Sequence, residues 1–524
     1  MTQANPEPAA LWQPLRSRIF RDLLLANVVS DIGAFMQTVG AAWLMVSLQA
    51  GPMYVALTQT AAALPFFVLA LPAGAIGDIT DRRKVILFTQ IWMMAVAAIL
   101  AATTLAGKMT PVLLLALTFA LSAGDAFESP TWRAVLPELV QKEDLAAASA
   151  LNGIEFNFAR AFGPALGGAL VAFAGAGVAF LLNALSFAGV IVAVFRWNRP
   201  TVKSTLPAET VAGATVAALR YVRFSPVVCA VLLRAGAAMF FASGLLALLP
   251  SIVHHANDSA IGYGALLGSF GCGAVLGAIG MQRARTRWST DAIVSTGIAV
   301  FGMATAGAGA LHHLLPLGAV MFIGGAAWIS FISLFNVTVL NQAPDWVRAR
   351  VLAVVMLVFQ GAVAAGSATW GALAVRMGAG TALLWAGFGT LSSTVLGLFW
   401  RLPDASVDLT PWNHWRIPFV VSPDSDVNGP VLVTVEYQVE GDKVAEFIRT
   451  MREYGRLRRR DGASCWRICR DAEMPDRYLE TFIVSSWAEH LRQHARAIRA
   501  DSQSEERLRN CIGGEPRTRH LLYL

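Results

Sequence analysis

The feature that most constrains this chain is a series of apolar segments, each about as long as a helix that crosses a lipid bilayer. A helix rises about 1.5 Å per residue, so about 20 residues cross roughly 30 Å of hydrocarbon. Polar or charged residues separate the segments, which predicts an all-α, multi-span membrane domain. We count twelve segments: 21–48, 54–76, 85–106, 111–128, 148–174, 178–195, 227–253, 261–281, 292–311, 314–340, 351–376 and 381–400.

The composition excludes an ordinary soluble enzyme. Hydrophobic residues make up 56% and charged residues 14% of the 524 residues, whereas soluble domains average about 25% charged residues. The net charge of +7 would suit a nucleic-acid binder. However, the basic residues lie in short loops between apolar segments, so membrane topology explains them better and we expect no nucleic-acid partner.

The basic residues also predict the orientation of the chain. They gather before the first segment, after the second and in the stretch 196–226, whereas the loops at the opposite ends hold only Lys108 and Arg376. Short cytoplasmic loops are rich in lysine and arginine. An even number of spans then places both termini in the cytoplasm, and we expect a multi-pass protein of the bacterial inner (plasma) membrane.

Weak internal similarity predicts a duplicated six-helix unit. Gly74-x-x-x-Asp78 before a basic cluster has a counterpart at Gly277, and the turn at Pro137 has a counterpart at Pro344. We expect a cytoplasmic N-terminal segment, an N-terminal half, a cytoplasmic middle loop, a C-terminal half, a proline-spaced linker and a C-terminal domain, with bounds 1–20, 21–195, 196–226, 227–401, 402–430 and 431–524.

Three motifs resemble major facilitator superfamily transporters. GAIGDITDRRK at 74–84 is similar to that superfamily's loop after the second span, with Ile79 and Asp81 replacing an arginine and a glycine. ARAFGPALGG at 159–168 resembles a motif common in antiporter-type exporters. AFESPTWRAVLPELV at 126–140 resembles the transmembrane secretion effector subfamily, which includes the enterobactin exporter. The resemblance implies transport, names no cargo, and implies a cytoplasmic gating network of Gly74, Asp78, Arg82, Arg83, Asp125 and Glu128.

Ionisable side chains within apolar spans are the candidates for the substrate or proton pathway, because each costs about 2.5–3.5 kcal/mol unless it meets a partner or water. For Asp31, proton or cation binding competes with a permanently hydrogen-bonded carboxyl. Glu155 and Arg160 are five residues apart, a poor angle for a helical pair. Arg160 is therefore expected to meet another span or an anionic substrate. Arg234 stands alone in the second half.

The glycine-rich end of the fifth segment predicts close helix packing. Gly163, Gly167 and Gly168 would let another helix approach, and Pro164 would kink the span. This end was expected to pack against the other half of the bundle.

The residues after Arg401 predict a separate domain. Strands are expected at 431–439, 464–470, 477–486 and 517–524, with amphipathic helices at 441–462 and 486–511. The order β-α-β-β-α-β is ferredoxin-like. The pattern resembles antibiotic biosynthesis monooxygenase-like domains, which implies a dimer through this domain. His490 and His494 share a helix face, as metal or haem ligands would, but we favour a solvated face and expect no metal.

These observations support two functions. The leading hypothesis is a proton-coupled exporter of a small organic molecule, siderophore-like or drug-like, whose partners are its substrate, protons and membrane lipid. It would need no cofactor and would not be an enzyme. The alternative is a membrane-tethered enzyme in which the C-terminal domain modifies a small molecule.

Overall fold

The structure is a computed structural model. It describes residues 11–197, 211–255, 259–311, 313–404, 407–410, 412 and 429–523. The chain forms two compact units. The first contains Met1–Pro207, Leu232–Phe335 and Val355–Arg401, and the second contains Ala208–Val231, Asn336–Val354 and Leu402–Leu524.

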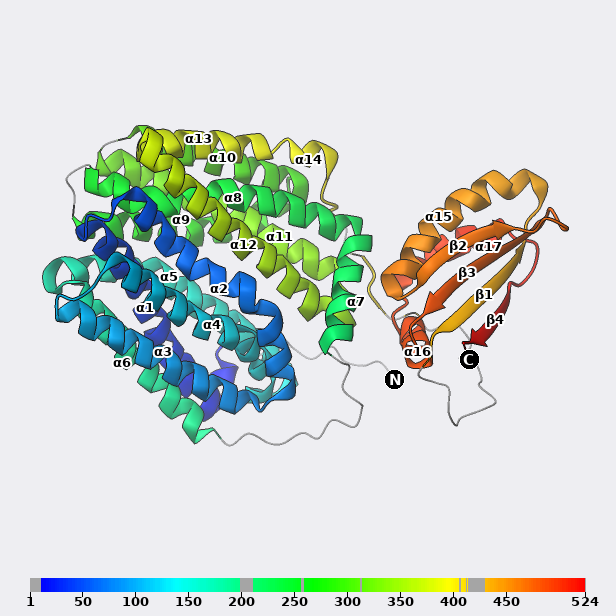
Figure 1. The fold of residues 1–524 in the computed structure, drawn as a ribbon, viewed down its shortest axis with the longest axis horizontal. Helices are drawn as coiled ribbons and strands as arrows, with labels where there is room; N and C mark the ends of the chain where they lie inside the picture. Colours follow the sequence, from blue (N-terminus) through cyan, green and yellow to red (C-terminus); the bar gives the residue numbers. More distant parts are fainter. Residues whose placement is uncertain are drawn as a thin grey trace. The chain divides into compact units, whose positions relative to one another are not determined.

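Long helices running alongside one another make up the first unit (Figure 1). Three of them, α8, α11 and α12, begin or end in residues of the second unit. The helices are α1 (Arg18–Ser47), α2 (Gly51–Ile79), α3 (Arg82–Leu105), α4 (Pro111–Leu139), α5 (Leu145–Ala174), α6 (Ala176–Arg196), α8 (Pro226–His255), α9 (Ala260–Arg285), α10 (Thr290–Ala310), α11 (Leu314–Gln342), α12 (Asp345–Met377), α13 (Ala379–Ser393) and α14 (Leu396–Phe399).

Within the described residues, eleven helices are long and apolar enough to cross a membrane, with α13 and α14 counted as one. The one remaining predicted segment, the fifth (148–174), is helical as α5 but is absent from this set. Its polar side chains, which include Glu155 and Arg160, lower its mean hydropathy. The same polar residues made this segment a candidate for function.

Turn chemistry sets where several helices begin and end. The Asp81 side chain accepts a hydrogen bond from the Arg83 backbone N–H, which caps α3, and Ser289 caps α10 in the same way. Gly175 ends α5 and Gly378 ends α12 with φ of 83° and 84°, a left-handed conformation that favours glycine. The same turn therefore closes the fifth and the eleventh of the predicted segments.

The predicted middle loop contains a helix that the sequence analysis did not anticipate. Helix α7 spans Val211–Phe224, and its Tyr221 is buried. Because Arg220 and Arg223 lie within it, the stretch resembles a charged loop when only apolar run length is considered. Its amphipathic spacing was the signal that could have found it.

The C-terminal domain contains the four predicted strands, with α15 between the first two. Its strands form one antiparallel sheet in the order β2-β3-β1-β4, and their alternate residues pack beneath α15 and α17. The elements are β1 (Val431–Gln438), α15 (Val444–Asp461), β2 (Ser464–Arg470), β3 (Arg477–Val484), α16 (Trp487–Ala495), α17 (Ser502–Asn510) and β4 (Arg517–Leu522).

The prediction of one helix over 486–511 was wrong, because the structure divides it into α16 and α17. Backbone hydrogen bonds explain the break. Trp412 N–H donates to the Ala497 carbonyl, and the amides of Arg499 and Ala500 donate to carbonyls of residues 410 and 408. The intervening residues thus pair with the segment that precedes the domain instead of continuing the helix.

Candidate functional site

A cavity of about 790 Å³ lies inside the first unit. Most of its lining comes from α1 to α6, with Leu246, Tyr263 and Gln360 contributed by later helices. Arg133 is the one basic residue among its described lining residues. Four carboxyl groups share the wall with it, from Asp31, Asp125, Glu128 and Glu155. The structure therefore brings together four residues that the sequence singled out on three different helices.

Asp31 on α1 and Glu155 on α5 form a carboxyl pair in this wall. The two carboxyl groups lie close enough to interact directly. A hydrogen bond between them would require a proton on one of them, because two ionised carboxylates have only acceptor atoms. Glu155 is 8% exposed, and its Oε1 atom has no hydrogen-bond partner among the described residues. One buried acceptor thus faces the cavity region without a donor.

Glycine packing explains why α1 and α5 lie close enough for this contact. A Cβ atom on Gly163 would lie 2.6 Å from Cβ of Phe35, and one on Gly167 would lie 2.7 Å from Cα of Met36. Larger residues would push the helices apart. Two of the three predicted packing glycines therefore hold α5 against α1 within the same half, and not against the other half.

Glu128 is fixed by neighbours on α3, whereas Asp125 one turn earlier on α4 is exposed within the lining of the cavity. The Glu128 carboxylate accepts hydrogen bonds from Thr89 Oγ1 at 2.9 Å and from Gln90 Nε2 at 2.7 Å. Glu128 is only 8% exposed. Its carboxyl group is consequently held by helix-to-helix hydrogen bonds, while Asp125 remains accessible.

The basic residues of the predicted gating network bind elsewhere. Arg82 forms an ion pair of 2.8 Å with Glu138 near the end of α4. Arg83 donates hydrogen bonds to the carbonyls of Val194 and Phe195 at the end of α6. These contacts tie the α2–α3 turn to two other helices. The surroundings of Gly74 and the side chain of Asp78 lie outside the described residues.

Two arginines predicted for the pathway do not line the cavity. The Arg160 guanidinium lies 5.2 Å from the centre of the Phe156 ring, and no ion pair of Arg160 occurs among the described residues. Arg234 is 1% exposed and donates to Asp291, Ser295 and the Trp400 carbonyl. Arg234 is thus a buried structural link between α8, α10 and the end of α14.

The two predicted halves contact each other at one end of the bundle. A Cβ atom on Gly168 of α5 would lie 2.7 Å from Cα of Gly264 on α9. The Trp43 ring stacks on Tyr263 with centroids 6.3 Å apart. Between α2 and α12, Thr60 Oγ1 donates to the Ala364 carbonyl at 3.1 Å. These contacts involve the end of α1 and the beginning of α2.

Buried amides are site residues that the sequence analysis missed. Asn183 donates a hydrogen bond to Gln37 across α6 and α1, and Gln37 lines the cavity. Gln90 fixes Glu128, as described above. Amide side chains inside membrane helices form interhelical hydrogen bonds. Searching the apolar segments for Asn and Gln, and not only for ionisable residues, would have found them.

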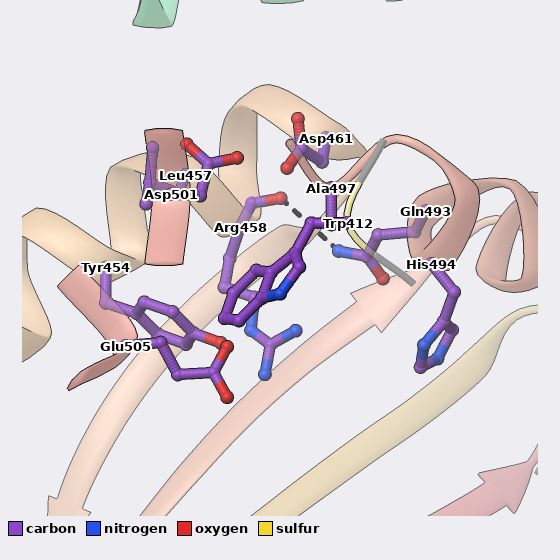
Figure 2. Close-up of a pocket in the computed structure, with 10 residues that line it drawn as sticks. All are labelled: Trp412, Tyr454, Leu457, Arg458, Asp461, Gln493, His494, Ala497, Asp501 and Glu505. Carbon is purple, nitrogen blue, oxygen red and sulfur yellow. Dashed lines mark hydrogen bonds between the residues drawn. The ribbon is translucent and has the colours of Figure 1, made fainter. Parts of the chain in front are cut away.

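A second, smaller cavity lies inside the C-terminal domain (Figure 2). Its volume is about 40 Å³. Figure 2 shows the Trp412 indole among its lining residues, near Arg458 and Tyr454. The cavity is far smaller than the roughly 300–1,000 Å³ of a typical ligand pocket.

The solvated-face interpretation of His490 and His494 was wrong for His490, which is 3% exposed. Its ring lies 4.6 Å from that of His494 and 4.8 Å from that of His520 on β4. Burial, followed by the two neighbouring histidines, lowers the pKa of His490 to about 3. Among the described residues, no group of three or more His, Cys, Asp or Glu side chains is arranged to hold a metal ion.

Solved transporter structures share the fold of the helical bundle. A bacterial homologue of the lysosomal transporter Spinster, in an inward-facing conformation, matches with a TM-score of 0.56 and 14% identity over 74% of this chain and 95% of that one. A bacterial homologue of the iron transporter ferroportin, also inward-facing, matches with a TM-score of 0.58 and 14% identity. The match covers 73% of this chain and 98% of that one. These likenesses, both at 14% identity, show the fold of the bundle.

Sequence comparison shows the class of protein, a multi-pass membrane transporter of the major facilitator type. Residues 9–524 match the family described as transmembrane secretion effector, and the chain belongs to that family. The uncharacterized MFS-type transporter YfiS of Bacillus subtilis is 27% identical over 69% of this chain and 88% of its own length. The staphyloferrin A transporter of Staphylococcus aureus is 26% identical over 30% of this chain, and the match spans only 40% of that protein.

Proposed function

We propose that this protein is a proton-coupled exporter that moves a small organic molecule across the bacterial inner membrane by alternating access. Twelve spans form two six-helix halves in this proposal, with α5 as the span that the hydropathy measure omits. Both termini and the ferredoxin-like C-terminal domain face the cytoplasm. The domain boundaries are those given in the sequence analysis.

The observation that carries the proposal is the pair of neighbouring carboxyl groups, Asp31 and Glu155, on the cavity wall. A pair of carboxyl groups that holds one proton can release it when water or a substrate reaches the site. The two residues come from α1 and α5, helices of the N-terminal half. The proposal therefore assigns proton binding to that half.

The contacts between the halves support an inward-facing conformation. Helices α5 and α9 meet through Gly168 and Gly264, at the ends that the basic loops place outside the cell. The cavity reaches Asn27, Arg133 and Asn152, which lie towards the cytoplasmic ends of α1, α4 and α5 in the proposed topology. A cytoplasmic molecule would therefore enter the cavity from that side.

A siderophore-like or drug-like cargo is part of the proposal. The size of the cavity, about 790 Å³, suits a drug-sized organic molecule. The printed name of the Staphylococcus aureus relative, a siderophore transporter, supports the siderophore-like option. Arg160 is not among the residues that line the cavity. An anionic cargo that binds this arginine therefore has little structural support.

The membrane-tethered enzyme remains the alternative and has weaker support. The support is weaker because the related proteins are transporters. Its natural active site would be a cavity of about 500 Å³ in the C-terminal domain, lined by residues such as Glu436, Arg477 and Arg517, because the cavity of Figure 2 is far smaller than a ligand pocket. Truncation after Leu402 separates the two functions. Export that survives the truncation supports a transporter, whereas turnover of a small molecule that depends on residues 431–524 supports the enzyme.

The test of the main proposal is uptake into inverted membrane vesicles whose lumen has been acidified. We expect at least one siderophore or drug to accumulate, and the accumulation should stop when the pH gradient is collapsed. Accumulation that persists without the gradient would contradict proton coupling. Vesicles from cells that lack the protein provide the background.

A further inference from the structure

The second compact unit joins three segments that are far apart in the sequence. It contains α7, the end of α11 with the beginning of α12, and the C-terminal domain. Buried apolar residues such as Ala217, Ala343 and Val347 lie in the first two of these segments. Aromatic rings and arginines connect the segments as well, and those contacts indicate what the C-terminal domain does for the rest of the chain.

Tyr221 of α7 lies at the centre of the first group of contacts. It is 2% exposed, and its hydroxyl donates to the Gln342 carbonyl at the end of α11 at 2.5 Å. Its ring meets Trp346 of α12 edge-on, with centroids 5.9 Å apart. Helix α7 is therefore fastened to both sides of the α11–α12 turn.

Two arginines of the C-terminal domain cover these rings. The Arg460 guanidinium lies 5.8 Å from the centre of the Tyr221 ring, and that of Arg496 lies 4.4 Å from the Trp346 ring. A guanidinium within about 6 Å of a ring centre is attracted to it, more strongly when water is excluded. Arg496 has a side-chain exposure of only 5%. The domain thus contacts both rings through its arginines.

A carboxylate completes the junction. Glu489 of α16 accepts from Arg496 at 2.6 Å and from Arg220 of α7 at 3.2 Å. Burial acts to raise the pKa of Glu489, but hydrogen bonds and charge from Arg496 and Arg220 prevail and lower it. The carboxylate is therefore ionised at neutral pH and holds two guanidinium groups that would otherwise repel each other.

We propose that the C-terminal domain is a clamp on the ends of the second-half helices, built from Glu489, Arg496 and Arg460 on the domain and from Arg220, Tyr221 and Trp346 on its partner segments. Helices α8, α11 and α12 continue from this unit into the bundle as unbroken helices. Their tilts therefore depend on whether the clamp is closed. Opening it changes the balance between the conformations of the transport cycle.

This inference rests on the alternating access of the proposed function but not on its proton coupling or cargo. It needs no known substrate to be tested. The clamp would give a cytoplasmic signal, such as a ligand of the C-terminal domain, a route to the membrane helices.

Hydrogen–deuterium exchange of the full-length protein in lipid nanodiscs tests the clamp. Glu489→Gln leaves Arg220 and Arg496 without their shared anion, whereas Glu506→Gln changes an exposed residue of the same domain. We expect Glu489→Gln to speed exchange in 215–224 and 340–348 by about tenfold or more, because opening controls the exchange of protected amides. Exchange in cavity helices α4 and α5 should change as well, with the β1 and β3 amides unaltered.

Two outcomes would overturn the proposal. Unchanged exchange in 215–224 and 340–348 would show that the ion pairs do not hold the junction. Faster exchange there with no change in α4 and α5 would show that the junction is not linked to the cycle. If Glu489→Gln does not fold, Trp346→Ala and Trp346→Phe replace it. The alanine variant should reproduce the opening, and the phenylalanine variant, which keeps a ring for Arg496, should restore most of the protection.

Discussion

Asp31 on α1 and Glu155 on α5 bring two carboxyl groups together in the wall of the cavity. Two carboxyl groups that share a site favour a form in which one of them holds a proton, and the glycine contacts between α1 and α5 keep the two residues in place. This relationship links helix packing to proton handling. Substitution of these residues can therefore separate a role in proton exchange from a role in helix packing.

Glu155→Gln tests whether the pair exchanges a proton or only holds two helices together. The amide can still donate to Asp31, so the helices should remain packed, but it cannot take up a proton. We expect gradient-driven uptake to fall by at least about tenfold, the effect of roughly 1.4 kcal/mol. Equilibration of the substrate down its own gradient should continue. Equal loss of both activities would indicate a structural role.

Gly168→Val tests the contact between the halves. Its new Cβ would lie 2.5 Å from the Ala260 carbonyl oxygen and 2.7 Å from Cα of Gly264, and backbone atoms cannot move away cheaply. Overpacking of this kind costs about 1–3 kcal/mol. We expect a lower melting temperature and faster deuterium exchange at the start of α9. Gly153→Ala is the control, because nothing lies within 4 Å of a Cβ at that position.

Arg234→Leu tests the structural role assigned to this arginine. It would remove the ion pair between Arg234 and Asp291, and breaking a buried ion pair costs about 3–5 kcal/mol. Because the Asp291 side chain is 24% exposed, we expect the lower end of that range. The double variant Arg234→Leu with Asp291→Leu should recover part of the melting temperature. If Arg234→Leu instead removes transport without loss of stability, the arginine belongs to the pathway after all.

His490 gives the C-terminal domain a pH-dependent stability. Its pKa is about 3 in the folded domain, against an ordinary value of about 6.5. Between these values the unfolded chain binds more protons, so the free energy of unfolding falls as the pH falls, by at most about 1.4 kcal/mol per pH unit. Above pH 6.5 the contribution is fully present. His490→Leu should flatten this dependence.

Urea titrations at several pH values measure the effect of His490. Unfolding of the domain can be followed by labelling of Cys511, which is 2% exposed, with each labelling pulse given at one common pH. His313→Leu is the control, because His313 is exposed in a turn of the other unit. An unchanged slope in His490→Leu would contradict the assignment of the low pKa.

Apolar run length was enough to predict the helical bundle, because a bilayer leaves few alternatives to long apolar helices. It did not predict partners. Arg234 was singled out as a pathway residue, but its partner Asp291 lies 57 positions away on another helix, and no local pattern encodes that pairing. In the same way, the position of Arg160 in the sequence does not encode the direction of its side chain.

The C-terminal domain shows the same limit. Strand alternation predicted its sheet, because alternate residues of β1 and β3 face one core. The burial of His490 depends on His520 of β4 and on Trp487, which only the fold brings together. The clamp was missed because α7 was interpreted as a loop. The role of the charged residues in an amphipathic helix such as α7 therefore becomes clear only when the surface that the helix contacts is known.

Proton movement coupled to cargo movement is the most direct test of the proposed function. Inverted vesicles with an acidified lumen should lose part of their pH gradient, reported by a fluorescent amine dye, when a transported cargo is added. The wild type and Asp22→Asn, which changes an exposed residue of the same helix, should respond alike. The double variant Asp31→Asn with Glu155→Gln should not respond. Cargo uptake by the wild type without any loss of the gradient would contradict the account.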